Sequence, residues 1–182
     1  MCLLLAGIPA FGQFFSIGVK GGVPLTSAYQ TFFDPGTPTS YDRPYIIGPT
    51  AEVHLPLHLS FEVDALYRRN GFTYFSTGRM RVNDWEIPFL GRYEFASGPI
   101  RPFVDAGITY RHVGTSGLPR VVIPPTNSSS AGFSLGGGLT LKLLIVRLSP
   151  EIRYTHWGTP PFENGSLLST TNQADFLVGF TF

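Results

Sequence analysis

The sequence predicts an all-β protein, an eight-stranded antiparallel up-and-down transmembrane β-barrel. Three observations predict this fold class. Apolar side chains alternate with small, polar or charged ones in eight segments, and the connections between those segments alternate between short and long. Charged residues make up only 14% of the chain, far fewer than in a soluble domain, while aromatic residues also reach 14%. A chain of 182 residues forms a single domain.

The eight alternating segments are the expected strands, and each has about the length that a tilted strand needs to cross a membrane. They are residues 15–23, 47–55, 59–68, 85–95, 101–111, 131–141, 146–155 and 175–182. In lipid every backbone N–H and C=O needs a partner within the protein, and a closed barrel meets this need. The lack of a long apolar run therefore does not exclude a membrane.

The connections differ in length in a regular way. Those at 56–58, 96–99 and 142–145 are short, whereas those at 24–44, 69–84, 112–130 and 157–172 are long. Bacterial outer-membrane barrels have tight periplasmic turns and long extracellular loops. The pattern therefore predicts four extracellular loops and a location in the outer membrane of a diderm bacterium.

The first segment of the chain is expected to be a signal peptide, residues 1–12, with the barrel domain at 13–182. A short apolar run is followed by small residues, and Ala10 and Gly12 stand at minus three and minus one from a cut before Gln13. No positive charge precedes the run, which indicates a truncated signal. An apolar first strand is the alternative interpretation.

Charge and cysteine content exclude several partners. The net charge is +1 and the basic residues are scattered, so no nucleic-acid surface is expected. Cys2 is the only cysteine, which leaves no disulfide framework and no cysteine metal site. We expect no cofactor, no metal and no catalytic residue.

The polar set of side chains is expected to face the lumen, because it combines Gly, Ser and Thr with charges that resemble an internal network. An eight-stranded barrel is just wide enough to be filled by side chains. Counting across the turns places Glu94 opposite Arg101 and Glu52 near Glu62. The two glutamates repel each other, so this second pair needs a cation from another strand. The predicted lumen charges are Lys20, Glu52, Glu62, Glu86, Arg92, Glu94, Arg101, Asp105, Arg147, Glu151, Arg153 and Asp175.

The inward glycines Gly107, Gly136, Gly138 and Gly179 are expected to leave space for long Arg side chains. On the apolar face, aromatic residues are expected at both membrane boundaries, where they form girdles. The predicted girdle residues are Trp85, Tyr93, Phe95, Tyr110 and Tyr154, with Trp85 beside Tyr110.

The chain resembles the small outer-membrane β-barrel family that includes the transmembrane domain of outer membrane protein A and the opacity-type surface proteins. The resemblance covers roughly residues 14–182. It is carried by Gly48–Val53 with Ser60–Val63, by Trp85–Phe89, Arg101–Gly107 and Ser149–Tyr154, and by the terminal Phe182. Phe176, Phe180 and Phe182 resemble the family's assembly signal, which implies recognition by the outer-membrane insertion machinery.

The expected function is that of a non-enzymatic, monomeric integral outer-membrane protein. Its four loops would serve surface recognition, adhesion or membrane integrity through an unidentified extracellular ligand. Aromatic loop residues for such a contact are Tyr29, Phe32, Phe33, Phe72, Tyr74 and Phe75.

Three alternatives remain open: a narrow small-solute channel, an outer-membrane lipid hydrolase and a soluble lipocalin-like carrier. A hydrolase needs a nucleophile, a His base and an orienting carboxylate. Its candidates are His54, His112, His156, Ser60, Ser116 and Glu163.

Overall fold

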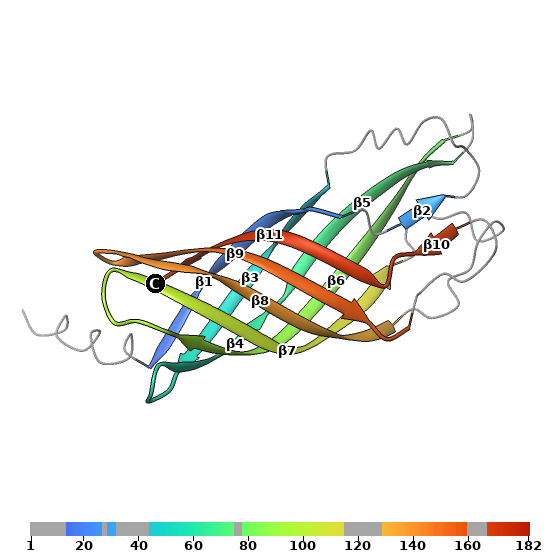
Figure 1. Cartoon of the computed structure of the whole chain (residues 1–182). Helices are drawn as coiled ribbons and strands as arrows, with labels where there is room; N and C mark the ends of the chain where they lie inside the picture. Colours follow the sequence, from blue (N-terminus) through green and yellow to red (C-terminus); the bar gives the residue numbers. More distant parts are fainter. Residues whose placement is uncertain (1–13, 27–28, 32–43, 75–77, 115–128, 160–166) are drawn as a thin grey trace, which may run out of the picture.

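The computed structural model describes residues 14–26, 29–31, 44–74, 78–114, 129–159 and 167–182; for 29–31, 70–74, 78–82, 113–114 and 167–169 it describes the backbone alone. The described residues form strands and no helix (Figure 1). The strands are β1 (Phe15–Pro24), β2 (Tyr29–Thr31), β3 (Tyr45–His54), β4 (Leu59–Asp64), β5 (Leu66–Tyr74), β6 (Gly78–Glu94), β7 (Ile100–Gly114), β8 (Ser129–Leu143), β9 (Val146–Trp157), β10 (Leu167–Ser169) and β11 (Asn172–Thr181).

The main sheet closes on itself into an antiparallel barrel. Each span of the main sheet pairs with the next span along the chain, and the ring closes through β1, which pairs with both β3 and β11. The sheet has nine strands, but β4 and β5 pair with β3 and β6 in one continuous register and therefore form a single span. The predicted eight-stranded up-and-down barrel is confirmed.

The break between β4 and β5 falls at Ala65, where two prolines interrupt the ladder. Ala65 donates its N–H to the carbonyl of Pro49 at 3.0 Å, but Pro49 has no N–H to return. Pro88, in the facing part of β6, is the second residue without a donor. The span keeps its register on both sides of Ala65, so the break affects the hydrogen bonds alone.

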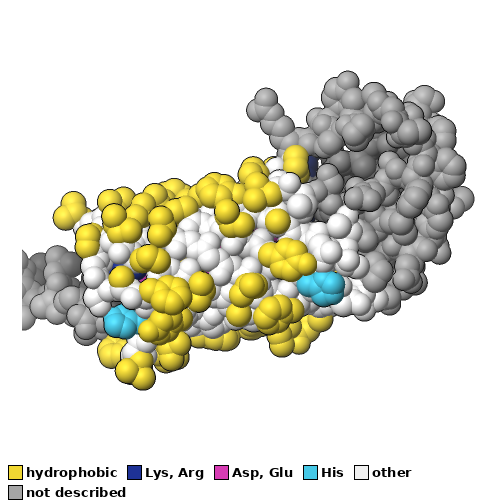
Figure 2. Space-filling view, viewed as in Figure 1, with side chains coloured by type: hydrophobic (Ala, Val, Ile, Leu, Met, Phe, Trp, Pro, Cys, Tyr) yellow, Lys and Arg dark blue, Asp and Glu magenta, His cyan; other side chains and the backbone are white. Residues whose placement is uncertain are grey.

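The two faces of the barrel differ sharply. Apolar side chains on the alternate outward positions are exposed. Figure 2 shows them spread in groups over the face in view, with charged atoms visible only in small patches near the ends. Most charged side chains of the spans are buried inside. A soluble carrier would need the opposite arrangement, so the lipocalin-like alternative is wrong. No helix in the described part of the chain is long and apolar enough to cross a membrane.

Several strands are longer than the sequence predicted. The connection expected at 69–84 is largely strand, because β5 continues to Tyr74 and β6 begins at Gly78. The small sheet of β2 and β10 was not predicted. Its residues lie within the stretches expected to be long loops, and runs of three residues are too short for periodicity to detect.

The predicted register between β6 and β7 is wrong by two residues. Glu94 pairs with Phe103, and Trp85 pairs with His112 instead of Tyr110. The turn is longer than a simple count suggested, because Phe95 N–H bonds the carbonyl of Pro102 at 2.8 Å and Gly98 adopts a φ of 147°. A shift of two residues leaves the alternation between inward and outward side chains unchanged, so both faces keep their predicted side chains.

The inward glycines do not all leave room for side chains, as had been expected. A Cβ at Gly107 would collide with the carbonyl of Phe89, and one at Gly138 with the carbonyl of Pro150. These two glycines allow neighbouring backbones to approach closely. Gly136 borders the carboxylates of Asp105 and Glu151, and Gly179 faces Lys20, so these two do make space for charged groups.

Candidate functional site: the charged lumen and the outer aromatic row

A cluster of eight charged residues, the central charge cluster, fills the middle of the lumen. Its members are Lys20, Glu52, Glu62, Asp64, Arg92, Asp105, Glu151 and Arg153. Glu62 is at its centre. One carboxylate oxygen bonds Lys20 and lies 3.0 Å from Arg153 Nη2, and the other lies 2.7 Å from Arg92 Nη2. Charges from β1, β4, β6 and β9 thus meet at one side chain.

The cluster explains how two glutamates can face each other. Glu52 and Glu62 are level on β3 and β4, as predicted. Arg92 lies 2.7 Å from Glu62 and 3.8 Å from Glu52, while Ser60 Oγ donates to Glu52 at 2.5 Å. Arg92, one of the predicted lumen charges, thus supplies the cation that this pair needs. Its guanidinium also stacks 3.9 Å from the centre of the Phe103 ring, so an apolar inward side chain supports it as well.

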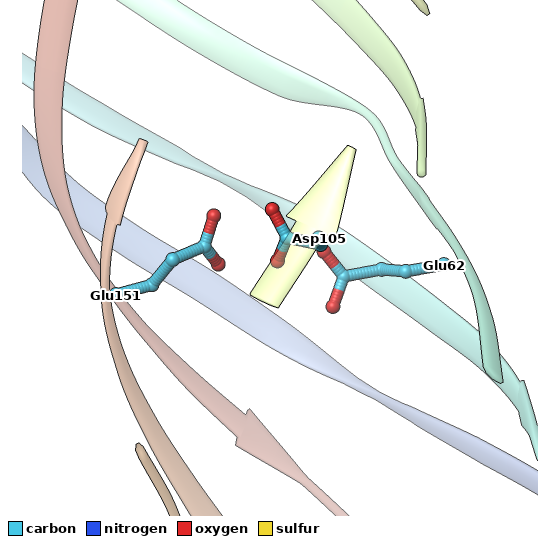
Figure 3. A group of neighbouring side chains, drawn as sticks. All are labelled: Glu62, Asp105 and Glu151. Atoms are coloured by element: carbon cyan, nitrogen blue, oxygen red, sulfur yellow. The ribbon is translucent and has the colours of Figure 1, made fainter. Parts of the chain in front are cut away.

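Three carboxylates in this cluster are close enough to consider a metal site. Single oxygens of Glu62, Asp105 and Glu151 lie within 4.8 Å of one another, and the side chains converge from three strands (Figure 3). The protein already supplies cations to each of them. Glu151 contacts Lys20 at 3.1 Å and Arg153 at 2.6 Å. We therefore assign the three carboxylates to the ion-pair network.

A second layer lies nearer the long-loop end of the barrel. Arg68 bonds Glu86 through Nε at 2.9 Å and Nη2 at 3.0 Å, and bonds both oxygens of Asp175 at 2.9 and 2.5 Å. Such bidentate pairs are the strongest form of Arg–carboxylate contact. Because Arg68 lies on β5 and Asp175 on β11, the contact spans the lumen. Beyond it, Arg111 stacks 4.0 Å from the Trp157 ring.

The short-turn end of the lumen is less enclosed. Arg101 Nη1 donates to Glu94 Oε2 at 2.8 Å, and both side chains are partly exposed. Arg147 does not join the central charge cluster, since its Nη1 contacts His54 Nε2 at 2.5 Å. These groups line the mouth of the barrel and leave the deeper cluster covered.

The hydrolase candidates do not form a hydrogen-bonded triad. His54 Nε2 lies 2.9 Å from Ser16 Oγ, but the same nitrogen also contacts Arg147, and His54 Nδ1 is 3.7 Å from Glu52, beyond hydrogen-bonding distance. Ser60 bonds Glu52 instead of a histidine. His112 and His156 bond Ser129 and Asn172 outside the lumen. Ser116 and Glu163 lie outside the described residues.

The structure also shows which lumen residues sequence reasoning missed. Asp64, Arg68, Asp84 and Arg111 are all buried on the inward face but were absent from the predicted network. Asp64, Arg68 and Arg111 each belong to the polar set of a predicted strand, so the alternation alone was a usable signal for these three. Parity gives the face of a residue, however, and not its partner across the lumen.

The outward aromatic residues gather toward both ends of the barrel. Tyr93 and Phe95 pack edge to face at 5.2 Å near the short turns. Toward the long loops lies the outer aromatic row, Tyr45, Tyr67 and Trp85, with centroid distances of 6.3 and 5.5 Å. Tyr110 packs on Phe89 at 6.2 Å, and Tyr154 bonds Asn172 at 2.7 Å. Tyr45 and Tyr67 were not predicted girdle residues.

Closed antiparallel topology, an apolar outer face and an ion-paired interior define a small eight-stranded barrel of the outer-membrane type. Solved structures with this fold include two outer-membrane or surface proteins. The outer membrane protein OprG from Pseudomonas aeruginosa matches with a TM-score of 0.62 at 15% identity, over 92% of this chain and 93% of that one. Neisserial surface protein A matches with a TM-score of 0.60 at 14% identity, over 92% and 95%. No protein-family model matches the sequence, and no curated protein does.

Proposed function

We propose that this chain is an integral outer-membrane protein whose sealed barrel is a non-enzymatic scaffold for four extracellular loops. The observation that carries the proposal is the reversal of the two faces: apolar side chains are exposed outside and ion pairs are buried inside. An aqueous environment would favour neither the apolar exterior nor the buried ion pairs, because an exposed apolar surface of this extent would have nothing apolar to contact. In a bilayer, lipid chains surround the apolar outer face. The closed hydrogen-bond ladder gives the backbone N–H and C=O groups partners within the protein.

The lumen supports a scaffold more than a channel. The central charge cluster and the Arg68 layer each connect strands across the interior, and their side chains are almost fully buried. An ion would have to separate several of these pairs in order to pass. The loops are then the parts left for recognition or adhesion, since binding residues concentrate on loops held by a rigid framework.

Several parts of the proposal come from the sequence alone. Residues 1–12 lie outside the described part, so the signal peptide stays a prediction. The same holds for the insertion-machinery signal, although the structure places Phe176, Phe180 and Phe182 exposed on the outer face. We also keep the monomer as a proposal. Tyr29, Phe32, Phe33, Phe72, Tyr74 and Phe75 have no described side chains.

Membrane fractionation tests the location. A tagged chain should appear in the outer-membrane fraction, resist extraction by carbonate and fold in detergent micelles, whereas in plain buffer it should aggregate. A folded protein that stays soluble without detergent would contradict the proposal.

Planar-bilayer recording separates the scaffold from the narrow channel. The wild-type barrel should produce no steady ohmic steps. The double variant Glu62→Ala with Arg92→Ala removes two large side chains from the centre and should raise conductance if it folds. Stable steps from the wild-type barrel would favour the channel.

A further inference from the structure

Arg69 differs from every other charged residue whose side chain the structure describes, because it lies on the outward face. Arg68, its neighbour on β5, is buried in the lumen, while Arg69 is half-buried and contacts an outward ring. An Arg on the lipid face costs about 2–4 kcal/mol at the bilayer midplane and little near the interfaces. Its position on β5, toward the long loops, is consistent with a guanidinium at the membrane–water interface.

The two residues level with Arg69 on the neighbouring strands are an aromatic one and a neutral polar one. The guanidinium carbon of Arg69 lies 6.0 Å from the centre of the Tyr45 ring, which begins the outer aromatic row. In the ladder Arg69 is level with Tyr45 on β3 and with Asn83 on β6. Rings of this kind gather at the headgroup level of a membrane. The row thus places the guanidinium at the depth of lipid phosphates.

Among the described side chains, no carboxylate pairs with the positive charge of Arg69. With those side chains Arg69 forms no ion pair, whereas Arg68, Arg92 and Arg153 each bind two or more carboxylates. A guanidinium has five N–H donors and no acceptor, and a phosphate, like a carboxylate, can accept two of them in a bidentate pair. The donors of Arg69 are therefore available to a ligand that comes from outside the protein.

Further basic residues lie along the same hairpin. The backbone ladder of β5 and β6 pairs Arg81 with Gly71 and Arg79 with Thr73, beyond the level of Arg69 toward the long-loop end. Arg69, Arg81 and Arg79 thus follow one another toward the long-loop end, on two adjacent strands that extend past the apolar part of the barrel. This arrangement complements an anionic layer above the acyl chains.

We propose that the outer face of the β5–β6 hairpin binds a phosphate group of an anionic lipid headgroup in the outer leaflet. Arg69 donates to the phosphate, while Tyr45, Tyr67 and Trp85 pack against the upper acyl chains and the headgroup. The proposal rests on the outer-membrane location proposed above. It adds a specific lipid partner to that location.

Native mass spectrometry of the detergent-folded barrel tests the site. Diphosphorylated lipid A and its dephosphorylated form serve as probes. The wild-type barrel should retain the phosphorylated form at least tenfold better, and Arg69→Gln should remove most of that preference. Arg69→Lys, which keeps the charge but loses the bidentate fork, should lie between them. Lys142→Gln removes a positive charge at the opposite end and should leave the preference unchanged.

Two results would overturn the proposal. One is an Arg69→Gln variant that discriminates between the two lipids as well as the wild type. The other is an equal loss in Lys142→Gln, which would mean a general effect of charge. Inorganic phosphate at millimolar concentration should not displace the lipid; displacement would make free phosphate the ligand and contradict a lipid site. A barrel that folds in detergent but fails these tests refutes this site and leaves the proposed location intact.

Discussion

Arg101 donates a hydrogen bond to Glu94 across 2.8 Å although the two residues are not level in the β6–β7 ladder, where Glu94 faces Phe103. The side chain of Arg101 is long enough to reach the carboxylate diagonally. A second bond from Arg101 Nε to the carbonyl of Gly98, at 2.9 Å, holds the guanidinium over the turn. The pair therefore closes the turn as well as joining two strands.

The Glu94–Arg101 pair should be only weakly coupled. The side chains are 11% and 21% exposed, so water screens the charges. A double-mutant cycle with Glu94→Gln and Arg101→Met, measured by unfolding from lipid vesicles, should give a coupling of about 0.5–1 kcal/mol. Strict additivity would mean that the pair contributes nothing in the membrane.

Glu62→Gln should be far more damaging, because Lys20, Arg92 and Arg153 all lose a charged partner in a site that water does not reach. Breaking a buried pair costs about 3–5 kcal/mol. The same unfolding measurement checks this value. Glu94→Gln is the matched control and should cost about 1 kcal/mol or less. Equal losses in the two variants would mean that the lumen is hydrated along its whole length.

Gly137 and Gly138 should respond oppositely to a methyl group. A Cβ at Gly137 meets nothing closer than 3.5 Å, whereas at Gly138 it would collide with the Pro150 carbonyl and lie 2.8 Å from Phe103 Cζ. We expect Gly137→Ala to be neutral or slightly stabilising and Gly138→Ala to cost about 1–3 kcal/mol. Urea titration in vesicles measures both. A destabilised Gly137→Ala with an unaffected Gly138→Ala would be inconsistent with this close backbone approach.

The cost of a lipid-facing charge should depend on depth. Leu135 lies near the middle of β8 and Leu143 at its end beside the short turn, and both are exposed on the outer face. Leu135→Arg should cost about 2–4 kcal/mol and Leu143→Arg about 1 kcal/mol or less. The ratio of folded to unfolded protein in vesicles reports this difference. Similar costs at both positions would argue against a bilayer around β8.

The sequence was sufficient to predict the barrel because period-two alternation is a local signal. Each strand reports which of its side chains share a face, and Lys20, Glu62 and Asp175 are all buried on the predicted side. Strand number and the alternation of short and long connections followed from the same pattern. The extension of β5 and β6 was missed because their outer parts, such as Gly71 and Gly78, lack a clear apolar row.

The alternation within each strand is a local signal and cannot predict which residues pair across the lumen. Arg68 and Asp175 are 107 positions apart in the sequence, and only the closure of the barrel brings them together. The register between β6 and β7 depends on the turn around Gly98, whose conformation the residue types alone do not specify. The close approach at Gly138 depends on the coiling of two strands, which is likewise a property of the assembled sheet.

The membrane assignment depends most on which face of the barrel meets lipid, and the two tryptophans test this directly. Trp85 is 48% exposed on the outer face, whereas Trp157 is 1% exposed, stacks against Arg111 and bonds Gln173 in the lumen. Trp157→Phe leaves only Trp85, and Trp85→Phe leaves only Trp157. Circular dichroism should first show that both variants fold in vesicles.

Fluorescence quenching by phospholipids with brominated acyl chains then separates the two faces. Trp85 should be strongly quenched, since its ring would contact the lipid directly, and Trp157 should lose little intensity. Strong quenching of Trp157 with weak quenching of Trp85 would contradict the assignment of the faces, and the membrane-embedded barrel with an ion-paired lumen would have to be abandoned.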